Sequence, residues 1–562
     1  MSSKTLSFEQ LVIGAQDGKK QNEQIQTETH GFGSEESGLS LDHEQDNTAE
    51  EGSFLSKYQH VQQLQQFLGF GGSDDLYLGV VSPPFQSCLK EIKTLVQREP
   101  ENVLTVESKT EKPPYAVSLE ILNKHTRRLK RLHNDKLNVS CYATECTEEE
   151  KGQKVSTPEI LRFELSMLNH PYAGSFVGLS ERETKDVQLV QYLLSAAEKV
   201  GEKQFYRAMK LLRKCDKMSF EKGNPVQRLV HYFSAALHER IDRETGRNSA
   251  KGVGKRVSLY VKRMLLSTNF SILAFQKAVP LSSVGEFVGM QAILEQVTNA
   301  RKVHIIDLHI RLGIQYTSLI QALAARVECP VEHLKITAVG TNYKAEIEET
   351  GRRLASFADS FNLAFSFSLV MVEGLQYLDK SHFELDNDEA LAVYAEYILT
   401  TMLQDSRHLG SLIRVIRDMN PCAIVIPEAE GNLNSPIFVE RFVEALFYFG
   451  AFFDAFEDGL KDDDANRTVM ESIFFSQGIK NIVATEGEER TMRLVPIKVW
   501  RDFFARFGMV ERKLSMSSKY QAKLVLENFP CGSSCTLDMD GESLIIGWKG
   551  IPTHSLSVWK FR

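Results

Sequence analysis

The sequence lacks several features that would indicate particular classes of protein. Its 562 residues include only eight cysteines, which we expect to be reduced core residues of a cytosolic or nuclear protein. The close pairs Cys141/Cys146 and Cys531/Cys535 have neither the two-residue gap nor the nearby histidines of a zinc site, so we expect no bound metal. The longest apolar run, ALFYFGAFFDAF, is too short to span a membrane and contains Asp454.

Charge and composition restrict the function further. The net charge of −8 gives no general attraction for nucleic acid, so any contact with DNA requires a local basic patch. The first residues, MSSKTLSFEQ, lack the basic and apolar stretches of a secretory leader, so we do not expect secretion. With 42% apolar and 25% charged residues, the composition is typical of a soluble intracellular protein.

The residue pattern changes along the chain and predicts two main parts. Residues 1 to about 52 are rich in polar residues and have few large apolar ones, which predicts disorder. Short apolar patches up to about residue 155 predict loosely ordered short helices. We therefore expect a variable, largely disordered region over 1–180 and a folded domain over 181–562, with a helical cap at about 181–300 and an α/β core at about 301–562.

The cap is predicted from apolar stripes at helical spacing. VQLVQYLLSAAEKV (187–200) and QRLVHYFSAALHERI (227–241) each place their large apolar residues three or four apart, as packed helices do. Two more helices are expected around VSLYVKRMLL (257–266) and EFVGMQAILEQV (286–297).

From Val303 onward the pattern becomes α/β. Helices are expected at 316–327 and 350–361, and strands at 303–307, 334–340, 365–372, 389–397, 422–428, 523–529 and 542–548. Apolar runs such as AIVI suit strands that are covered on both faces. The fold class is therefore α/β, with a parallel core that carries helices on both sides and ends in antiparallel strands.

The first strand, VHIID, is followed by a helix, the arrangement in which many α/β proteins hold a nucleotide. A dinucleotide site needs glycines in that turn, yet Asp307 is followed by five larger residues before Gly313. The next strand ends in GTNY (340–343) rather than in an acidic residue that would hold a ribose. Both chemical requirements are missing, so we predict no bound cofactor and no enzymatic activity.

Glu428 and Glu430 follow another predicted strand, a position suited to acid/base chemistry. Ser435 and Pro436 resemble a helix start, with serine as N-cap and proline at the first helical position. The acidic residues are then as readily explained by a capping network as by catalysis.

Two basic segments have functional and structural interpretations. The run KHTRRLKRLHNDK (124–136) is either a nuclear-import signal or a solvated helix face. Its basic candidates for import are Lys124, Arg127, Arg128, Lys130 and Arg131. The segment RNSAKGVGKRVSLYVKRM (247–264) is either a DNA contact or a solvated face next to a flexible loop. Its candidate DNA contacts are Lys251, Lys255, Arg256, Lys262 and Arg263.

From about Glu181 to Arg562, a series of ordered motifs resembles the GRAS family of plant regulatory proteins. The VHIID motif stands as Val303, His304, Ile305, Ile306 and Asp307. The segment called PFYRE is similar to SPIFVERFVEALFYF, with Pro436, Phe438, Arg441 and Glu444. The C-terminal region that ends in the SAW motif is similar at Trp500, Arg501, Trp548 and Trp559. The acidic-leucine motif of the DELLA branch is incomplete in the N-terminal region, so the resemblance favours a non-DELLA member.

The resemblance implies a methyltransferase-like Rossmann core with an α-helical cap. It also implies a nuclear transcription regulator that works through partners: other GRAS proteins as homo- or heterodimers, zinc-finger or other transcription factors, and promoter DNA directly or indirectly, with no membrane. Two other functions stay open. One is an S-adenosylmethionine-dependent methyltransferase or other small-ligand enzyme on the same core, and the other is an adaptor without DNA contact.

Overall fold

A computed structural model describes residues 155–169, 179–247, 274–276 and 278–562. The chain divides into two compact units, 1–64 and 65–562, and all described residues belong to the second. Residues 1–154 and 170–178 of the region 1–180 that was expected to be largely disordered lie outside the described residues, as do the basic run 124–136, the helix expected at 257–266 and the candidate DNA residues 251–263. None of the described helices is long and apolar enough to cross a membrane.

The cap is built from long helices that begin where the sequence supplies capping residues. Ser180 and Glu183 form a reciprocal capping box at the start of one helix, and Asn224 and Gln227 form another at the start of a helix whose first residue is Pro225. The apolar stripes predicted at 187–200 and 227–241 are buried, as expected. The four helices are α5 (Thr157–Asn169), α6 (Glu181–Gly201), α7 (Phe205–Met218) and α8 (Pro225–Glu244).

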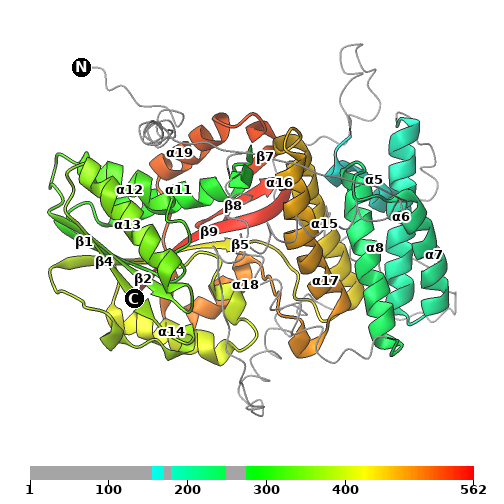
Figure 1. The fold of residues 1–562 in the computed structure, drawn as a ribbon. Helices are drawn as coiled ribbons and strands as arrows, with labels where there is room; N and C mark the ends of the chain where they lie inside the picture. Colours follow the sequence, from blue (N-terminus) through cyan, green and yellow to red (C-terminus); the bar gives the residue numbers. More distant parts are fainter. Residues whose placement is uncertain (1–154, 170–178, 248–273, 277) are drawn as a thin grey trace, which may run out of the picture. The chain divides into compact units, whose positions relative to one another are not determined.

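Helix α5 precedes the boundary expected at residue 181 and packs against α6. It also packs against α15 (Phe438–Gly459), which comes from the C-terminal half of the chain. Helix α17 (Ser476–Ala484) packs against α8, so both C-terminal helices adjoin the cap (Figure 1). The packing therefore does not follow a division of cap from core at residue 300.

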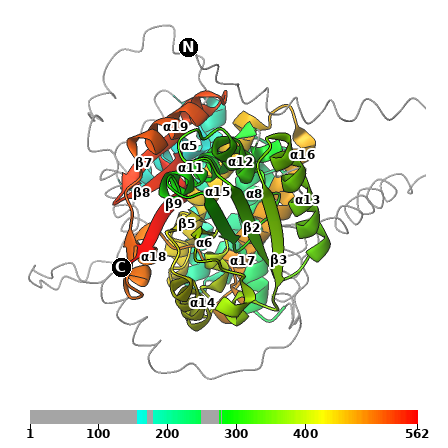
Figure 2. The ribbon, with the colours of Figure 1, turned by 90° about the vertical axis from the view of Figure 1, so that its left-hand side faces the viewer.

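The core is a mixed sheet, which within the described part of the chain has nine strands. Their order is β3-β2-β1-β4-β5-β9-β8-β7, with β6 beside β9. Neighbours from β3 to β5 are parallel, and β9, β8, β7 and β6 pair in antiparallel fashion. Figure 2 shows the sheet from β7 at one edge to β3 at the other. The predicted parallel core ending in antiparallel strands is confirmed. The strands are β1 (Lys302–Asp307), β2 (His333–Gly340), β3 (Phe365–Met371), β4 (Glu389–Tyr394), β5 (Ala423–Ala429), β6 (Met509–Glu511), β7 (Cys535–Asp540), β8 (Ser543–Trp548) and β9 (Ile551–Phe561).

Helices cover both faces of the sheet (Figure 1). Alternate residues of β1 enter two different apolar clusters: Val303 and Ile305 pack in one, and Ile306 packs in the other. The first cluster includes buried residues of α11 (Leu281–Gln296), α12 (Gln315–Ala324) and α13 (Lys344–Ser360). The second includes those of α14 (Ser406–Met419) and α18 (Ile497–Ala505). Alternation along a strand that is covered on both faces explains why VHIID is apolar at nearly every position.

One predicted strand is wrong. Residues 523–529 belong largely to helix α19 (Met516–Glu527), which Ser515 caps by accepting a hydrogen bond from the Ser518 amide. The helix buries Ser518 and Ala522 on one face, so only one side of the run KLVLENF meets the core. Strands β6, β7 and β9 were not predicted, since polar residues within them interrupt the apolar pattern.

Candidate functional site

The carboxyl end of β1 is closed by contacts within the protein. Asp307 is fully buried; its Oδ1 accepts a hydrogen bond from the His309 amide at 2.8 Å, and its Oδ2 accepts one from the Tyr316 hydroxyl at 2.7 Å. Burial raises the pKa of Asp307 to about 7, against the lowering effect of these two bonds. Asp307 therefore holds the turn and the first residues of α12 in place, leaving both oxygens engaged.

The turn after β1 is packed with side chains, as the sequence predicts. Leu308 and Ile310 are buried. Gly313 has a φ of +66°, and a Cβ built on it would lie 2.9 Å from the Thr350 side chain. At the end of β2, a Cβ on Gly340 would lie 2.6 Å from the Ile347 side chain. The space beside each of these two glycines is therefore filled by side chains of the protein itself. Neither turn provides an open backbone cradle for a pyrophosphate.

Beside these strand ends lies a charged cluster that the sequence did not reveal. Arg311 Nη2 lies 2.9 Å from Glu396 Oε1, and the Arg311 guanidinium sits 5.3 Å from the centre of the Tyr397 ring. Glu286 of α11 is buried and accepts a hydrogen bond from Gln276 Nε2 at 2.8 Å. Burial raises the pKa of Glu286, the nearby Glu396 carboxylate raises it further, and Arg311 opposes both. This cluster joins three segments that are distant in sequence, which is why no local pattern indicates it.

Glu428 and Glu430 accept hydrogen bonds from neighbouring segments of the chain. Glu428 is buried within β5 and accepts hydrogen bonds from the Thr400 amide at 3.2 Å and the Thr400 hydroxyl at 3.3 Å. Burial raises its pKa to about 8. Glu430 Oε2 accepts a hydrogen bond at 2.9 Å from the Ile497 amide, the first residue of α18. These contacts favour the capping interpretation over acid/base catalysis.

The helix start predicted at Ser435 and Pro436 is wrong by two residues. Helix α15 begins at Phe438, and its N-cap is Ile437. Ser435 Oγ accepts a hydrogen bond from the Ile437 amide at 3.2 Å and donates one to Glu440 at 2.9 Å. The serine therefore closes a short turn before the helix, and Pro436 is exposed within that turn.

The VHIID residues form the inner part of the sheet. Val303, Ile305 and Ile306 are fully buried. His304 Nε2 lies 2.8 Å from the Thr337 hydroxyl on β2, and its Nδ1 lies 3.0 Å from Glu389 on β4. Burial lowers the pKa of His304 to about 4, so the ring is neutral at physiological pH. Its hydrogen bond with Thr337 ties β1 to β2, and the Glu389 carboxylate of β4 lies beside the ring on the other side.

The PFYRE-like residues hold the start of α15. Arg441 is fully buried; it donates hydrogen bonds to the Ser435 carbonyl at 2.6 Å and to the Ile482 carbonyl at 3.1 Å, and it pairs with Glu486. Phe438 is buried, and the Arg240 guanidinium of α8 lies 3.9 Å from its ring centre. Glu444 accepts a hydrogen bond from Asn432 at 3.5 Å.

Residues of the C-terminal motifs connect distant elements. Trp548 Nε1 donates a hydrogen bond to Asp454 of α15 at 2.8 Å, and Trp559 Nε1 donates one to Ser557 at 2.8 Å. Trp500 is buried and stacks on Phe504. Arg501 joins α18 to β6 and β7 through Glu511 at 2.8 Å and Asp540 at 3.0 Å. The three tryptophans and Arg501 therefore stabilise the fold.

Comparisons with known proteins agree with this arrangement of motifs. The model of the GRAS domain family matches residues 189–560. The chain belongs to the GRAS domain family. The chain is 28% identical to the DELLA protein GAI1 of Vitis vinifera over 68% of its own length and 63% of that protein. It is 30% identical to the GRAS family protein RAD1 of Lotus japonicus over 69% of its length and 77% of that protein.

A solved structure supports the same assignment. The crystal structure of SCL7 from Oryza sativa aligns with a TM-score of 0.57 and 27% identity, covering 66% of this chain and 99% of that chain. The GRAS fold, a Rossmann-like sheet with a helical cap, is therefore shown for this protein.

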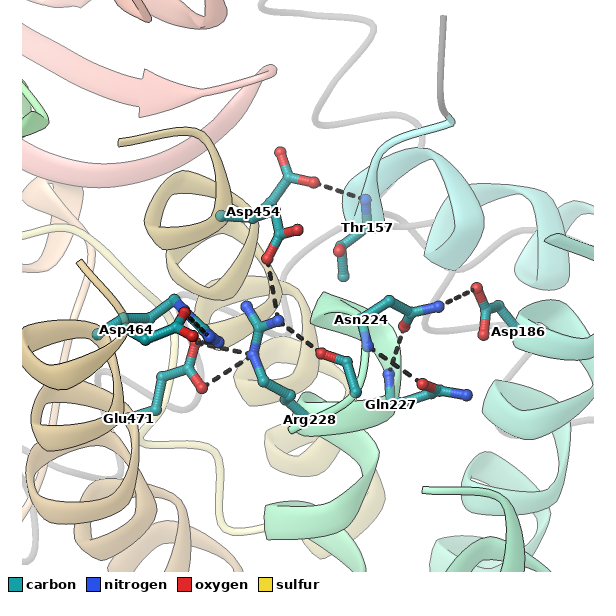
Figure 3. Close-up of polar contacts among 11 residues, drawn as sticks. Thr157, Asp186, Asn224, Gln227, Arg228, Asp454, Asp464 and Glu471 are labelled. Carbon is teal, nitrogen blue, oxygen red and sulfur yellow. Dashed lines mark hydrogen bonds and ion pairs between the residues drawn. The ribbon is translucent and has the colours of Figure 1, made fainter. Parts of the chain in front are cut away.

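A buried ion-pair network lies between the cap of this GRAS protein and its C-terminal helices (Figure 3). Arg228 of α8 is 1% exposed, and its Nε lies 3.0 and 2.9 Å from the two carboxylate oxygens of Glu471. Its Nη1 reaches Glu457 at 3.0 Å and the Gly223 carbonyl at 2.8 Å. Glu471 lies in a short π-helix, Met470–Phe475. Beside the network, Asp454 accepts a hydrogen bond from the Thr157 amide at 2.8 Å.

The structure also describes a basic helix face that was not predicted from the sequence. Helix α7 exposes five cationic residues, and none of them forms an ion pair with another described residue. The 3, 4, 3 spacing of four of them forms one stripe about 15 Å long at 1.5 Å per residue. These five are Arg207, Lys210, Arg213, Lys214 and Lys217.

Two lysines of α7 lie over aromatic rings, one of α7 itself and one of α6. Lys210 Nζ lies 4.6 Å from the Tyr206 ring centre, and Lys214 Nζ lies 4.4 Å from that of Tyr192. The acidic residue of this helix, Asp216, is engaged by His238 at 3.0 Å and Ser234 at 2.6 Å. A count of charges by segment would have found this face.

No group of three or more histidine, cysteine, aspartate or glutamate side chains within the described ranges has an arrangement that could hold a metal ion. The five cysteines in these ranges are free thiols. Burial raises the pKa of Cys531 to about 11 and that of Cys535 well above its ordinary value.

Proposed function

We propose that this protein is a nuclear transcription regulator of the GRAS type, without enzymatic activity. The observation that carries the proposal is the closed end of β1, where Asp307 is hydrogen-bonded within the protein and Leu308 and Ile310 are buried. Membership of the GRAS domain family supports a regulatory role. The protein acts through other GRAS proteins or zinc-finger and other transcription factors.

Chromatin immunoprecipitation of the tagged full-length protein, with mass spectrometry of the co-purified nuclear proteins, tests the regulatory role. We expect enrichment at discrete promoters, altered transcription of the genes beside them, and recovery of transcription factors. If the protein enriches no promoter and changes no transcript, the proposal is wrong. If it recovers transcription factors but enriches no promoter DNA, it is an adaptor without DNA contact.

The basic face of α7 favours direct contact with the phosphate backbone of DNA. Its cations, none of which forms an ion pair with another described residue, recur every three or four residues along a helix in a chain of net negative charge. Such an arrangement positions a protein on a duplex through phosphates rather than through bases. The segment with Lys251, Lys255, Arg256, Lys262 and Arg263 stays a second candidate for the same contact.

The salt dependence of binding distinguishes these possibilities. We expect Lys210→Ala combined with Lys214→Ala to lower the slope of log affinity against log salt by about 0.9 for each lost phosphate contact. The matched control is Lys344→Ala with Lys461→Ala, two lysines exposed elsewhere, which leaves the slope unchanged. An unchanged slope in the folded α7 variant would eliminate this surface. The double variant Lys255→Ala with Arg256→Ala tests the alternative segment in the same assay.

A further inference from the structure

Helix α19 carries a row of apolar side chains on its outer face. Met516, Tyr520 and Leu524 are 77%, 62% and 38% exposed. Their four-residue spacing places them on successive turns along one side of the helix. Single exposed apolar residues are ordinary on protein surfaces, but three in one row form a continuous strip of the kind found at interaction sites.

The opposite side of α19 is fixed to the domain. Ser518 and Ala522 are buried, and the hydroxyls of Ser515 and Ser518 donate to Glu295 Oε1 of α11 at 2.7 and 3.2 Å. Figure 1 shows α19 on the outer side of α11. Because the helix is held in place without a partner, binding to its outer face orders little additional backbone, which favours affinity.

The apolar row is flanked by positive charge. Between residues 512 and 526 the sequence contains four basic and no acidic residues. These four residues form no ion pair within the part of the chain that the structure describes. The four are Arg512, Lys513, Lys519 and Lys523.

We propose that α19 is a docking surface for an acidic amphipathic helix of a partner protein. Apolar side chains of the partner at three- and four-residue spacing pack against Met516, Tyr520 and Leu524, and its flanking carboxylates meet the four cations. This proposal rests on one part of the proposed function, namely that the protein acts by binding other proteins, and it names the kind of partner. It does not require contact with DNA.

The observations favour this occupant over three others. A second copy of the chain, paired through the same surface in a two-fold dimer, would bring the same four cations face to face. Nucleic acid would meet the cations and stack on Tyr520, but it would leave Met516 and Leu524 without apolar partners. A membrane would bury only three apolar side chains, since Ala522, Val525 and Leu526 of α19 lie in or against the core of the domain.

The test uses the full chain and a fluorescein-labelled synthetic peptide of about 18 residues, five helical turns, with leucines at helical spacing and glutamates on the flanks. A scrambled peptide of identical composition lacks the apolar stripe. We expect saturable binding of the amphipathic peptide by fluorescence anisotropy, and affinity at least about tenfold lower for the scrambled peptide. The triple variant Met516→Gln, Tyr520→Gln and Leu524→Gln weakens binding by at least about tenfold.

The matched control is Tyr377→Gln, a tyrosine 54% exposed outside α19, which leaves the affinity unchanged. Circular dichroism and the melting temperature check that all variants fold. A second variant, Lys519→Glu with Lys523→Glu, weakens the peptide's binding and removes most of its salt dependence. It shows the contribution of charge separately from that of the apolar row.

Four results would each overturn the proposal. The first three are no saturable binding of the peptide, equal affinity for the scrambled peptide, and unchanged affinity of the triple variant. The fourth is that the wild type binds one of the other occupants and the triple variant does not. The other occupants to be measured are a DNA duplex, phosphatidylserine vesicles and a second copy, the last by analytical ultracentrifugation. Because the assay contains no promoter, a failed chromatin experiment and a failed docking experiment are distinguishable.

Discussion

At the scale of single residues, the family motifs of this protein consist mainly of buried side chains. His304, Arg441 and Trp548 each connect one element to another through hydrogen bonds. Sequence reasoning found these positions and predicted that Val303, Ile305 and Ile306 lie in the core. It did not find the partners, because a hydrogen bond between residues 94 positions apart, such as that of Trp548 with Asp454, leaves no local pattern.

The first prediction concerns the apolar residues of β1. Val303→Ala, Ile305→Ala and Ile306→Ala each lower the free energy of unfolding by roughly 2 to 4 kcal/mol, because each removes fully buried methyl groups and leaves a cavity. Denaturant unfolding followed by circular dichroism measures the loss. Val327→Ala, at a residue 87% exposed, is the control and changes the free energy by less than about 0.5 kcal/mol. Equal effects at buried and exposed positions would contradict the assignment of β1 to the core.

The second prediction concerns pH. Burial raises the pKa of Glu428 to about 8, while in the unfolded chain it is about 4.3. The stability from this bound proton is complete below about pH 4.3 and is lost as the pH rises to about 8, at up to about 1.4 kcal/mol per pH unit. Glu428→Gln removes this contribution, so its free energy of unfolding falls less steeply with pH than that of the wild type. Parallel curves for the two proteins between pH 5 and 8 would contradict the raised pKa.

At the scale of elements, the sequence correctly predicted the helices and strands in which the alternation of apolar and polar residues follows burial alone. Strands β1 to β5 and helices α6 and α8 follow apolar periodicity closely. The strand predicted at 523–529 was wrong, because this segment belongs largely to α19. Val525 and Leu526 are only partly buried there, and the exposed Leu524 adds an apolar residue on the outer side of the helix, so the run looked like a continuous apolar strand. It also missed β9, in which six consecutive residues from Thr553 to Val558 are buried although several are polar.

The third prediction concerns the junction between α8 and the π-helix. Arg228→Met lowers the free energy of unfolding by about 3 to 5 kcal/mol, because it removes the guanidinium hydrogen-bonded to the buried Glu471 carboxylate and leaves only Arg467, at 3.8 Å, beside it. Adding Glu471→Leu recovers most of the loss, since the pair is then replaced by apolar side chains. The control Arg207→Met changes an exposed arginine of α7 and has little effect. A double variant as unstable as Arg228→Met alone would contradict a specific role for the ion pair.

At the scale of the whole molecule, the α/β class and the family could be read from the sequence, but the packing of the cap could not. Helices α15 and α17 follow β5 in the chain and nevertheless pack against α5 and α8. Such contacts bring together segments that are far apart in the sequence. A cap defined by a single range of residue numbers therefore leaves out helices that pack within it.

The fourth prediction concerns nuclear residence. If the basic run 124–136 is the import signal that we propose, replacing Lys124, Arg127, Arg128, Lys130 and Arg131 with alanine shifts a fluorescent fusion of the protein from the nucleus to the cytoplasm. Alanine at five exposed basic residues of another surface, those of α7, is the control and leaves the fusion nuclear. Unchanged nuclear fluorescence in the first variant would refute this route of import.

The central claim is that the end of β1 holds the protein's own side chains in place of a cofactor. Isothermal titration calorimetry of the full-length protein with S-adenosylmethionine tests it most directly, with Asp307→Asn as the matched variant. We expect no saturable heat from either protein, and a lower melting temperature for Asp307→Asn because the bonds to His309 and Tyr316 are weakened. Saturable binding to the wild type that disappears in Asp307→Asn at an unchanged melting temperature would contradict the claim.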